Sequence, residues 1–533
     1  MTVVLACDHA PASENTETLK QRPNILLIVA DDLGYSDLGS YGSEIRTPVL
    51  DELAYSGVRF TNFHVAATCS PTRAMLMSGI DHHRAGLGNM AVWMAPNQRG
   101  EPGYEGHINN VVVPIPERLR MAGYHTYMAG KWHLGHDKAH WPAANGFERD
   151  LSLIGGAGSH FSDMSNIVPQ RPKVTMTLDG ERIYSLAADY FSTKNFTDFL
   201  IEGIKADRAD DRPFFAFLAL QVPHVPLQLP ADWIDRNTGR YDKGYDQLRM
   251  ERLARQKTLG IVDPAVTGAV GEAGVPRWQD LSENGQRISA RKMEIYAGIV
   301  ENMDHHIGRL MSFLSDIGEL ENTLVIFMSD NGPAAEDTRG FISDVMGADA
   351  GAWFDTAFNN QYENIGRPGS WIGYGPAWAQ VSAVPFRLFK ATLAEGGVRV
   401  PLVINKPGLS GQGGMDASLL SVTDLVGALL QVADGEPLSL QGRSADRPLG
   451  MELFGQRALI SGEWKLLNLS LNKRENNWAL YDIQADPAEQ TNLATLQPAV
   501  LAQLVEQWEQ YAKLNGVILP LGRKQPRPYK SLE

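Results

Sequence analysis

A cysteine at the start of a predicted helix is the first candidate for chemistry in the sequence. Cys69 opens the run Cys-Ser-Pro-Thr-Arg, which ends at Arg73, and Pro71 stands where the first turn of a helix tolerates proline. A helix N-terminus attracts anions and lowers the pKa of a thiol. The alternative is a small buried hydrophobic residue, which is the commoner fate of a cysteine. The residues alone leave both interpretations open.

Acidic and amide groups follow two apolar segments of strand length. Asp31 and Asp32 come directly after Asn-Ile-Leu-Leu-Ile-Val-Ala. Asp330 and Asn331 follow Thr-Leu-Val-Ile-Phe-Met-Ser. All four offer hard oxygen ligands, which suit calcium or magnesium better than zinc. Helix and turn capping is the alternative for adjacent acidic residues, but groups at two strand ends favour a shared metal site.

Two lysines and two histidines stand beside apolar segments. Lys131 and His133 belong to Gly-Lys-Trp-His, Lys390 lies in Phe-Arg-Leu-Phe-Lys-Ala, and His224 follows the apolar segment 214–220. Histidine suits proton transfer near neutral pH, and an ammonium group suits an anion. Taken singly, each lysine also fits a solvated surface residue, and each histidine fits a hydrogen-bonded structural one.

The elements that carry these residues alternate between strand and helix. Apolar runs at 24–30, 214–220 and 323–328 predict buried parallel strands, and apolar residues at helical spacing predict a helix over 292–314. Ligands bind beyond the carboxyl ends of strands in open α/β sheets, so the acidic groups are expected to meet there. We predict an α/β fold with a large mixed, mostly parallel sheet sandwiched between helices.

Two long segments interrupt this pattern and are expected to be irregular. Residues 231–289 are polar and charge-rich, and surface decoration explains them as well as a functional loop does. Residues 336–383 are rich in glycine, tryptophan and tyrosine. Because aromatic side chains are costly to expose, we expect the second segment to form a pocket wall.

The chain of 533 residues is too long for one ordinary core. We predict a disordered leader over 1–21, a catalytic domain over 22–406 and a smaller α+β subdomain over 407–533, with an antiparallel sheet and a closing helix. The expected elements near the C-terminus are a helix over 419–432, short strands over 457–467 and 478–483, and a helix over 500–514.

The formal net charge of −14 excludes an extended nucleic-acid interface, which requires a basic face. Two cysteines, Cys7 and Cys69, make no disulfide framework, and no apolar run reaches membrane-spanning length. The run Val-Val-Leu-Ala-Cys7 is similar to the end of a bacterial lipoprotein signal, although most of the signal's basic and apolar regions are missing. The run therefore has two interpretations, a lipid anchor at Cys7 or a chance match.

The run from Cys69 to Gly79 resembles the first signature of the type I sulfatases, in the alkaline-phosphatase superfamily. The run from Gly123 to His133 resembles their second signature. The similarity extends from about Arg22 to the C-terminal helix and looks closest to the bacterial arylsulfatases. The acidic pairs, His224 and Lys390 also follow in the order that this family shows.

This resemblance implies hydrolysis of a sulfate monoester, a small molecule, to an alcohol or phenol plus inorganic sulfate. A separate formylglycine-generating enzyme would oxidise Cys69 to formylglycine, whose hydrate attacks sulfur and then expels sulfate. Calcium is implied, and magnesium less so. The implied metal ligands are Asp31, Asp32, modified Cys69, Asp330 and Asn331. In the implied mechanism Asp330 acts as the base, His133 accepts the second proton, and Arg73 supports the hydrate. Lys131 and Lys390 bind the sulfate, and His224 protonates the leaving group.

Two other functions are kept as alternatives. The first is a phosphonate monoester or phosphodiester hydrolase, since relatives with the same motif cleave these tetrahedral anions. The second is a sulfated-glycan binding protein without activity. The aromatic segment favours an apolar leaving group, aryl or alkyl. The incomplete, signal-like leader and the family resemblance imply a location in the periplasm or cell envelope, with the cytoplasm as the alternative.

Overall fold

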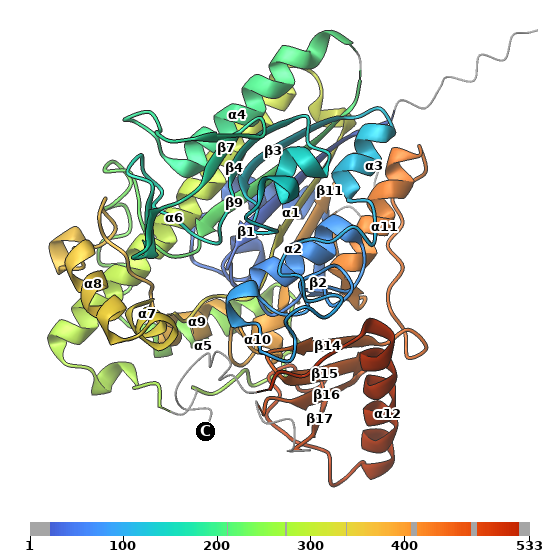
Figure 1. Ribbon diagram of the computed structural model, residues 1–533. Coiled ribbons are helices and arrows are strands. Elements are labelled where there is room, and N and C mark those ends of the chain that lie inside the picture. Colours follow the sequence, from blue (N-terminus) through green and yellow to red (C-terminus); the bar gives the residue numbers. More distant parts are fainter. Residues whose placement is uncertain are drawn as a thin grey trace, which may run out of the picture.

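One mixed sheet forms the centre of the protein in the computed structural model (Figure 1). Its strand order is β12-β2-β11-β10-β1-β9-β3-β4-β7-β8, and β13 also pairs with β2. The pairs β10–β1, β1–β9, β9–β3 and β3–β4 are parallel, whereas β10–β11, β11–β2, β4–β7 and β7–β8 are antiparallel. The predicted α/β fold with a mixed, mostly parallel sheet is confirmed.

The structure describes residues 22–210, 212–271, 274–336, 338–406, 413–470 and 477–521. The strands of this sheet are β1 (Asn24–Asp31), β2 (Val58–His64), β3 (His125–Lys131), β4 (Arg149–Leu153), β7 (Met176–Leu178), β8 (Glu181–Ile183), β9 (Phe214–Pro223), β10 (Thr323–Ser329), β11 (Arg399–Asn405), β12 (Gly414–Asp416) and β13 (Leu420–Ser421).

The three strands predicted from apolar runs, β1, β9 and β10, lie side by side and are buried along their whole length. Leu27 of β1 stands opposite Phe217 of β9 and Ile326 of β10. Successive side chains of a strand point to opposite faces. In β1, Leu26 and Ile28 accordingly belong to one core, and Leu27 to the other. A strand buried on both faces needs apolar residues at every position, which is why these runs were recognisable.

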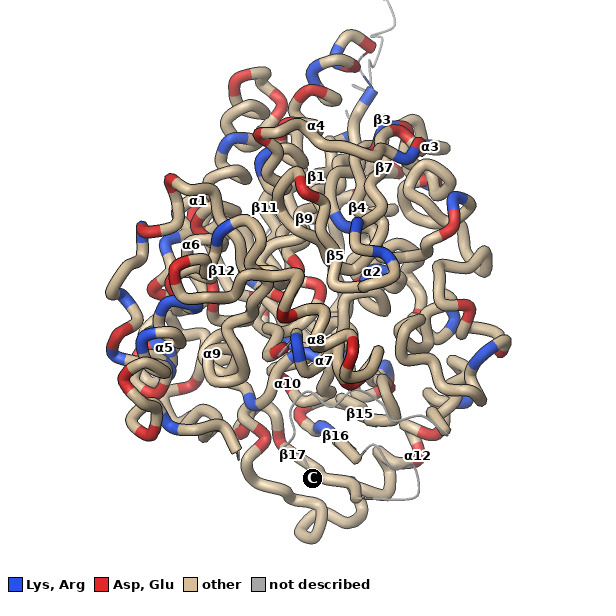
Figure 2. The backbone as a smooth tube through the Cα atoms, turned by 60° about the vertical axis from the view of Figure 1, so that its left-hand side comes forward, with Lys and Arg blue, Asp and Glu red and all other residues tan. Residues whose placement is uncertain are grey.

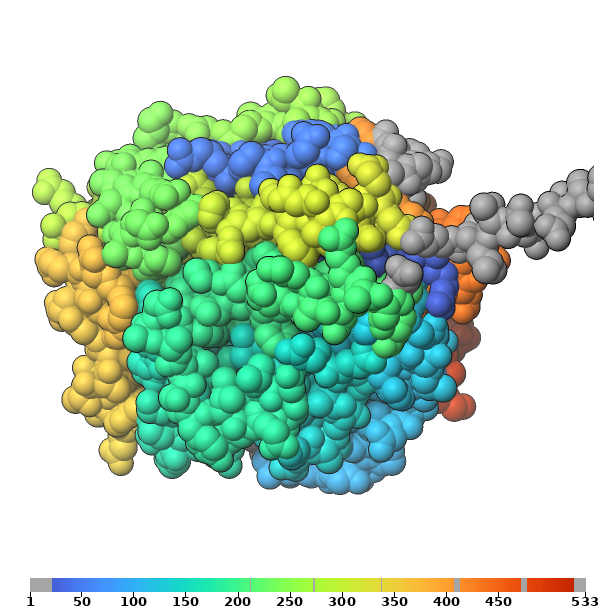
Figure 3. Space-filling view, turned by 90° about the horizontal axis from the view of Figure 1, so that it is seen from above, coloured from blue at the N-terminus to red at the C-terminus, as the bar shows by residue number. Residues whose placement is uncertain are grey.

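Helices cover both faces of the sheet. On one face α6 (Glu283–Asp316) packs against α1 (Pro48–Ser56) and α4 (Ser192–Asp207), and Figure 3 shows α6 in yellow between them. On the other face lie α2 (Cys69–Ser78), α3 (Ile115–Met121) and α11 (Val422–Ala433). The helix expected over 292–314 is confirmed within α6, which begins earlier because the Ser282 side chain caps its first turn.

The two segments expected to be irregular are partly helical, which corrects that expectation. The first contains α5 (Tyr245–Thr258), along which Figure 2 shows acidic and basic residues crowded together. The second contains α7 (Thr338–Met346), α8 (Ala348–Ala357) and α9 (Pro376–Ser382). Its large aromatic side chains Trp371, Tyr374 and Trp378 are buried in hydrophobic clusters, so they do not form an open pocket wall.

A second, antiparallel sheet of four strands packs beside the first (Figure 1). Its order is β14-β15-β16-β17, and α12 covers one face, as predicted for the C-terminal part. By contrast, β12, β13 and α11 belong to the large sheet and its core, which favours a domain boundary after α11. The division at 406 stays a prediction. The elements are β14 (Leu449–Leu453), β15 (Gln456–Ser461), β16 (Trp464–Asn468), β17 (Ala479–Asp482) and α12 (Pro498–Asn515).

A buried ion-pair cluster joins the segment after α2 to the C-terminal sheet and α12. His83, which follows α2, places Nδ1 2.7 Å from Asp81 and Nε2 2.8 Å from Glu452 of β14. Tyr511 of α12 donates to the other oxygen of Asp81 at 2.8 Å. The carboxylates raise the pKa of His83 to about 9, although burial opposes this.

The leader over 1–21 and its Cys7 lie outside the described residues. Within the described part of the chain, none of the helices has both the length and the apolar character needed to cross a bilayer.

Candidate active site

The predicted site residues meet at the carboxyl edge of the large sheet. Asp31 is the last residue of β1, Lys131 is the last residue of β3, and Asp330 follows β10. His224 follows β9, and Cys69 begins α2. Since β10, β1, β9 and β3 are parallel neighbours, their carboxyl ends lie along one edge. Groups separated by up to about 300 positions in the sequence are thereby brought together.

Three carboxylates and one amide form the centre of the site. Asp31, Asp330 and the Cys69 thiol each place a ligand atom within 4.8 Å of the others, and Asp31 and Asp32 do the same with His224. All are buried. Each carboxylate also faces a lysine or arginine of the site, and the hard oxygen donors gathered here suit calcium or magnesium.

An unsatisfied amide oxygen supports the fit of a cation. Asn331 donates through Nδ2 to Asp32 Oδ1 at 2.7 Å and to the carbonyl oxygen of Gly332 at 2.8 Å. These bonds leave Oδ1 of Asn331 buried without a hydrogen-bond partner among the described residues. A buried acceptor is costly to leave unpaired, so this oxygen could serve as a ligand of a bound cation.

The Cys69 side chain is 2% exposed and lies at the start of a helix whose residues are all buried. Burial raises the pKa of its thiol, and the nearby ammonium groups of Lys131 and Lys390 oppose the rise without reversing it. At this position desolvation outweighs the favourable charges, so the pKa of the thiol lies above its ordinary value. An unmodified thiol at this position is a weak nucleophile at neutral pH.

Arg73 lies one turn further along α2 and connects two strand ends. Its Nε and Nη2 atoms are both 2.8 Å from Oδ2 of Asp330, and Nη1 donates to the carbonyl oxygen of Lys131 at 2.6 Å. Burial and the negative charge of Asp31 raise the pKa of Asp330 to about 6, although Arg73 lowers it. A carboxyl group with this pKa exchanges protons near neutral pH.

His133 stands against the thiol, with Nδ1 3.3 Å from Sγ of Cys69. Its backbone has a φ of +62°, a region that few residues other than glycine adopt. Burial and the positive charges of Lys131 and Arg73 hold its pKa well below the usual value. The imidazole is therefore neutral at pH 7 and can accept a proton from the group at position 69.

Each lysine of the site pairs with an aspartate. Lys131 Nζ is 2.7 Å from Asp31 Oδ2, and both side chains are fully buried. Lys390 Nζ is 2.8 Å from Asp32 Oδ1 and 3.4 Å from Glu336 Oε1, a partner that sequence reasoning missed. These carboxylates hold the pKa of Lys390 well above its ordinary value, so its ammonium group stays charged.

His224 contacts the same cluster. Its Nδ1 is 2.6 Å from the carbonyl oxygen of Val225, so this nitrogen carries a proton. Its Nε2 is 3.5 Å from Asp32 Oδ2 and is the nitrogen directed at the site. All seven residues predicted to act in catalysis and all the predicted metal ligands thus lie in one cluster.

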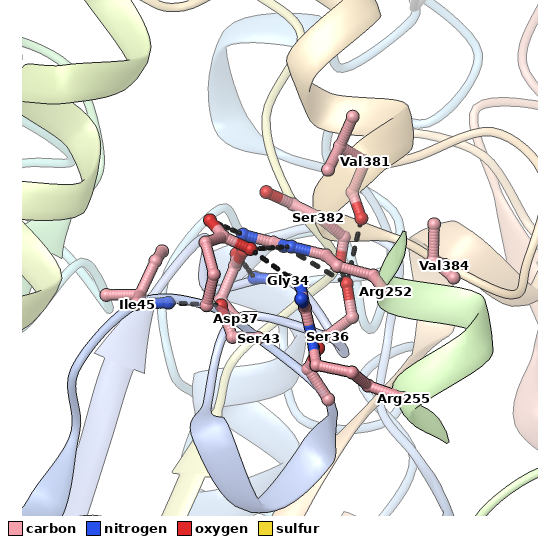
Figure 4. Close-up of polar contacts among 12 residues, drawn as sticks. Gly34, Ser36, Asp37, Ser43, Ile45, Arg252, Arg255, Val381, Ser382 and Val384 are labelled. Atoms are coloured by element: carbon pink, nitrogen blue, oxygen red, sulfur yellow. Dashed lines mark hydrogen bonds and ion pairs between the residues drawn. The ribbon is translucent and has the colours of Figure 1, made fainter. Parts of the chain in front are cut away.

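Both long inserted segments support the loop that follows Asp32 (Figure 4). Arg252 of α5 binds Asp37 at 2.6 Å and is fully buried. Ser36 donates to the carbonyl oxygen of Val381, at the end of α9, at 2.8 Å. Asp37 in turn accepts the N–H of Gly34 at 2.9 Å. Sequence reasoning did not find Arg252 or Asp37, since nothing local marks either as buried.

Comparison with known proteins decides the family. The family described as Sulfatase matches residues 23–435. The chain belongs to the sulfatase family. It is 38% identical to an uncharacterised sulfatase of Schizosaccharomyces pombe, over 95% of this chain and 96% of that one. It is 37% identical to an arylsulfatase of Klebsiella aerogenes, over 78% of this chain and 88% of the relative.

A solved structure has the same fold. The crystal structure of Ps i-CgsB in complex with k-i-k-neocarrahexaose aligns with a TM-score of 0.65 at 23% identity, covering 93% of this chain and 94% of that one. The predicted membership of the type I sulfatases, in the alkaline-phosphatase superfamily, is confirmed. This sulfatase is a sulfuric ester hydrolase, and its substrates are sulfate esters.

Proposed function

We propose that this sulfatase hydrolyses aryl or alkyl sulfate monoesters by means of formylglycine at position 69 and a bound calcium ion. The observation that carries the proposal is the convergence of Cys69, a buried carboxylate cluster and two lysines at one edge of the sheet. The similarity to an arylsulfatase over most of the chain supports the choice of substrate class.

The calcium ion would be held by Asp31, Asp32, Asp330 and Asn331, together with the modified side chain at position 69. When bound, it would polarise the sulfate ester and lower the pKa of the attacking hydroxyl. The unpartnered Oδ1 of Asn331 fits this role. Calcium is proposed over magnesium because the family resemblance implies it.

Oxidation of Cys69 to formylglycine would supply a hydrated aldehyde, with one hydroxyl for attack on sulfur and one for release of sulfate. Asp330, which Arg73 holds beside residue 69, would serve as base for the first hydroxyl. His133 is neutral and stands at the side chain of residue 69, so it takes the second proton. Arg73 orients Asp330 and keeps positive charge beside the reacting groups.

The two lysines bind the sulfate oxygens. Lys131 pairs with Asp31, and Lys390 pairs with Asp32. In the loaded site, the two carboxylates would therefore contact the calcium ion while the two ammonium groups contact the sulfate. Negative charge that develops on the sulfuryl oxygens is stabilised by ammonium groups already fixed in a buried site. His224 directs Nε2 at the site and protonates the departing oxygen when that nitrogen carries a proton.

The test begins with residue 69. Cys69→Ala is expected to lower turnover of 4-nitrophenyl sulfate on the order of 10⁴-fold or more, because the nucleophile is lost. Cys69→Ser is expected to give at most one turnover, since a serine sulfate ester has no second hydroxyl to expel sulfate. Full activity of Cys69→Ala would refute the proposal.

Mass spectrometry of the peptide that contains residue 69 tests the modification directly. Conversion of the thiol to the aldehyde lowers the peptide mass and makes it reactive toward hydrazides. Co-expression with a formylglycine-generating enzyme, the proposed maturation partner, should increase both the converted fraction and the activity. Activity that does not follow the converted fraction would contradict the role of formylglycine.

Parallel assays with matched sulfate, phosphonate and phosphodiester substrates decide between the sulfatase proposal and the alternative. We expect the highest kcat/KM with the sulfate monoester. A comparison of an aryl sulfate, a long alkyl sulfate and a sulfated sugar tests the proposed aryl or alkyl class. We further propose a periplasmic or cell-envelope location, which fractionation of the native host tests.

A further inference from the structure

The second sheet contacts the segment around Lys390 through Lys465, which pairs with Glu395 at 2.7 Å, and through a glutamine side chain close to Lys390 itself. Gln456 is the first residue of β15 and is 2% exposed. Its Nε2 donates to the carbonyl oxygen of Ala391 at 2.8 Å, and its Oε1 accepts the N–H of Leu393 at 3.1 Å. One amide group therefore fastens the backbone immediately after Lys390 at two points.

The backbone around Lys390 adopts a conformation that needs such support. Leu388 has a φ of +58° and Ala391 a φ of +67°. Both values lie in the left-handed region, which the Cβ atom disfavours in residues other than glycine. Two further hydrogen bonds, Lys390 N–H to Pro333 O at 3.0 Å and Ala391 N–H to Ala67 O at 2.8 Å, hold the same turn.

These bonds join the Lys390 turn to the segments that carry Asp330 and Cys69. Pro333 follows the Asp330 strand end, and Ala67 precedes Cys69 by two positions. The third attachment, through Gln456, comes from the C-terminal sheet. A lysine side chain is long and has many rotamers, so the place of its ammonium group depends on a fixed backbone.

We infer that Gln456 is a positioning residue for Lys390, and that the C-terminal sheet thereby completes the anion-binding part of the active site. The inference rests on the proposed function, in which Lys390 binds a sulfate oxygen. Gln456 holds the 391–393 backbone, and the held backbone keeps Nζ of Lys390 at Asp32, where the substrate's sulfate is bound. Gln456 itself touches neither substrate nor metal.

The chemistry of the amide makes the inference testable by substitution. Gln456→Met keeps the length of the side chain but neither hydrogen bond. Gln456→Glu keeps the acceptor for Leu393 N–H but places an oxygen against the Ala391 carbonyl, where a donor is required. A matched control is Glu452→Gln, on the neighbouring strand β14, because it weakens the contact with His83 at the same interface without touching the Lys390 segment.

The first experiment needs no turnover. Amide hydrogen exchange of residues 388–396, followed by mass spectrometry in the calcium-loaded protein, should be roughly ten times faster in Gln456→Met than in wild type or Glu452→Gln, because the Leu393 N–H loses its acceptor. Unchanged exchange would overturn the inference. This result stands whether or not the protein hydrolyses sulfate esters, so it separates a failure of the inference from a failure of the proposed function.

The second experiment is a double-mutant cycle with 4-nitrophenyl sulfate. Gln456→Met should lower kcat/KM roughly 10- to 100-fold, mainly through KM, because a displaced ammonium group binds the sulfate less well. In the Lys390→Ala background the same substitution should change kcat/KM less than about threefold, since Gln456 acts through Lys390. Equal losses in both backgrounds, or an equal loss in Glu452→Gln, would mean a general structural role and overturn the inference.

Discussion

Replacement of Arg252 by methionine tests whether the inserted helix α5 supports the loop that follows Asp32. In the native protein Arg252 binds Asp37 at 2.6 Å and Glu44 at 2.9 Å. Removal of one partner from a buried ion pair leaves an uncompensated charge and costs about 3–5 kcal/mol. Asp37 still accepts from Tyr296 at 2.7 Å, and Glu44 from Tyr241 at 2.9 Å. We therefore expect a loss near the lower limit, about 3 kcal/mol.

Urea unfolding at pH 7 measures this loss. For a slope of about 3 kcal/mol per molar urea, the expected decrease of the midpoint is about 1 M. The matched control is Arg255→Met, since Arg255 also binds Glu44, at 3.3 Å, but is 37% exposed. An exposed pair contributes about 1 kcal/mol or less, so the control should lower the midpoint by about 0.3 M at most.

Two further results follow from the same network. Asp37→Asn in the Arg252→Met background should recover part of the stability, because it removes the uncompensated charge. The calcium concentration needed for half-maximal activity should also rise in Arg252→Met, since the loop after Asp32 is less constrained. Equal midpoints for Arg252→Met and Arg255→Met would refute the reasoning, because the buried pair would then add nothing beyond a surface contact.

Three other predictions concern charge and chemistry. His83 has a pKa of about 9 in the folded protein against 6.5 in model compounds, so its protonation stabilises the fold by up to about 3 kcal/mol below pH 6.5. This stabilisation is lost as the pH rises through 9. Urea unfolding should therefore show wild type more stable than His83→Gln at pH 6, with the difference in stability gone at pH 9.5. Asn331→Leu should raise the calcium concentration for half-maximal activity roughly tenfold or more, as measured by titration of the chelated protein. His224→Ala should slow hydrolysis of an alkyl sulfate roughly 100-fold or more, yet 4-nitrophenyl sulfate much less, because a good leaving group needs little protonation.

Sequence patterns predicted those helices and strands that bury apolar side chains. β1, β9 and β10 are apolar at every position, and α6 repeats apolar residues at helical spacing. Helix α5 was missed because it buries Arg252 and Gln256 instead of an apolar stripe. Their partners, Asp37 and Tyr41, lie more than 200 positions away, so no local pattern indicates that these polar side chains are buried.

The candidate site was predictable for a different reason. Signature runs around Cys69 and Lys131, and acidic groups after apolar strands, mark it in the sequence. What the sequence could not indicate is how the residues are paired: Lys390 with Glu336, or Gln456 with Ala391. Such contacts depend on how segments far apart in the sequence pack in the folded protein. The raised pKa of Cys69 likewise arises from burial by the whole fold and not from its helix.

The enclosure of α2 constrains the order of events during biosynthesis. The whole helix that begins with Cys69 is covered on every side by the finished protein, and only 2% of that cysteine is accessible. A second protein that must bind several residues around the thiol cannot reach them in the folded protein. An enzyme that forms the proposed formylglycine must therefore act on the polypeptide before folding encloses α2. Under the proposed mechanism, chain that folds before this conversion would be well ordered but inactive.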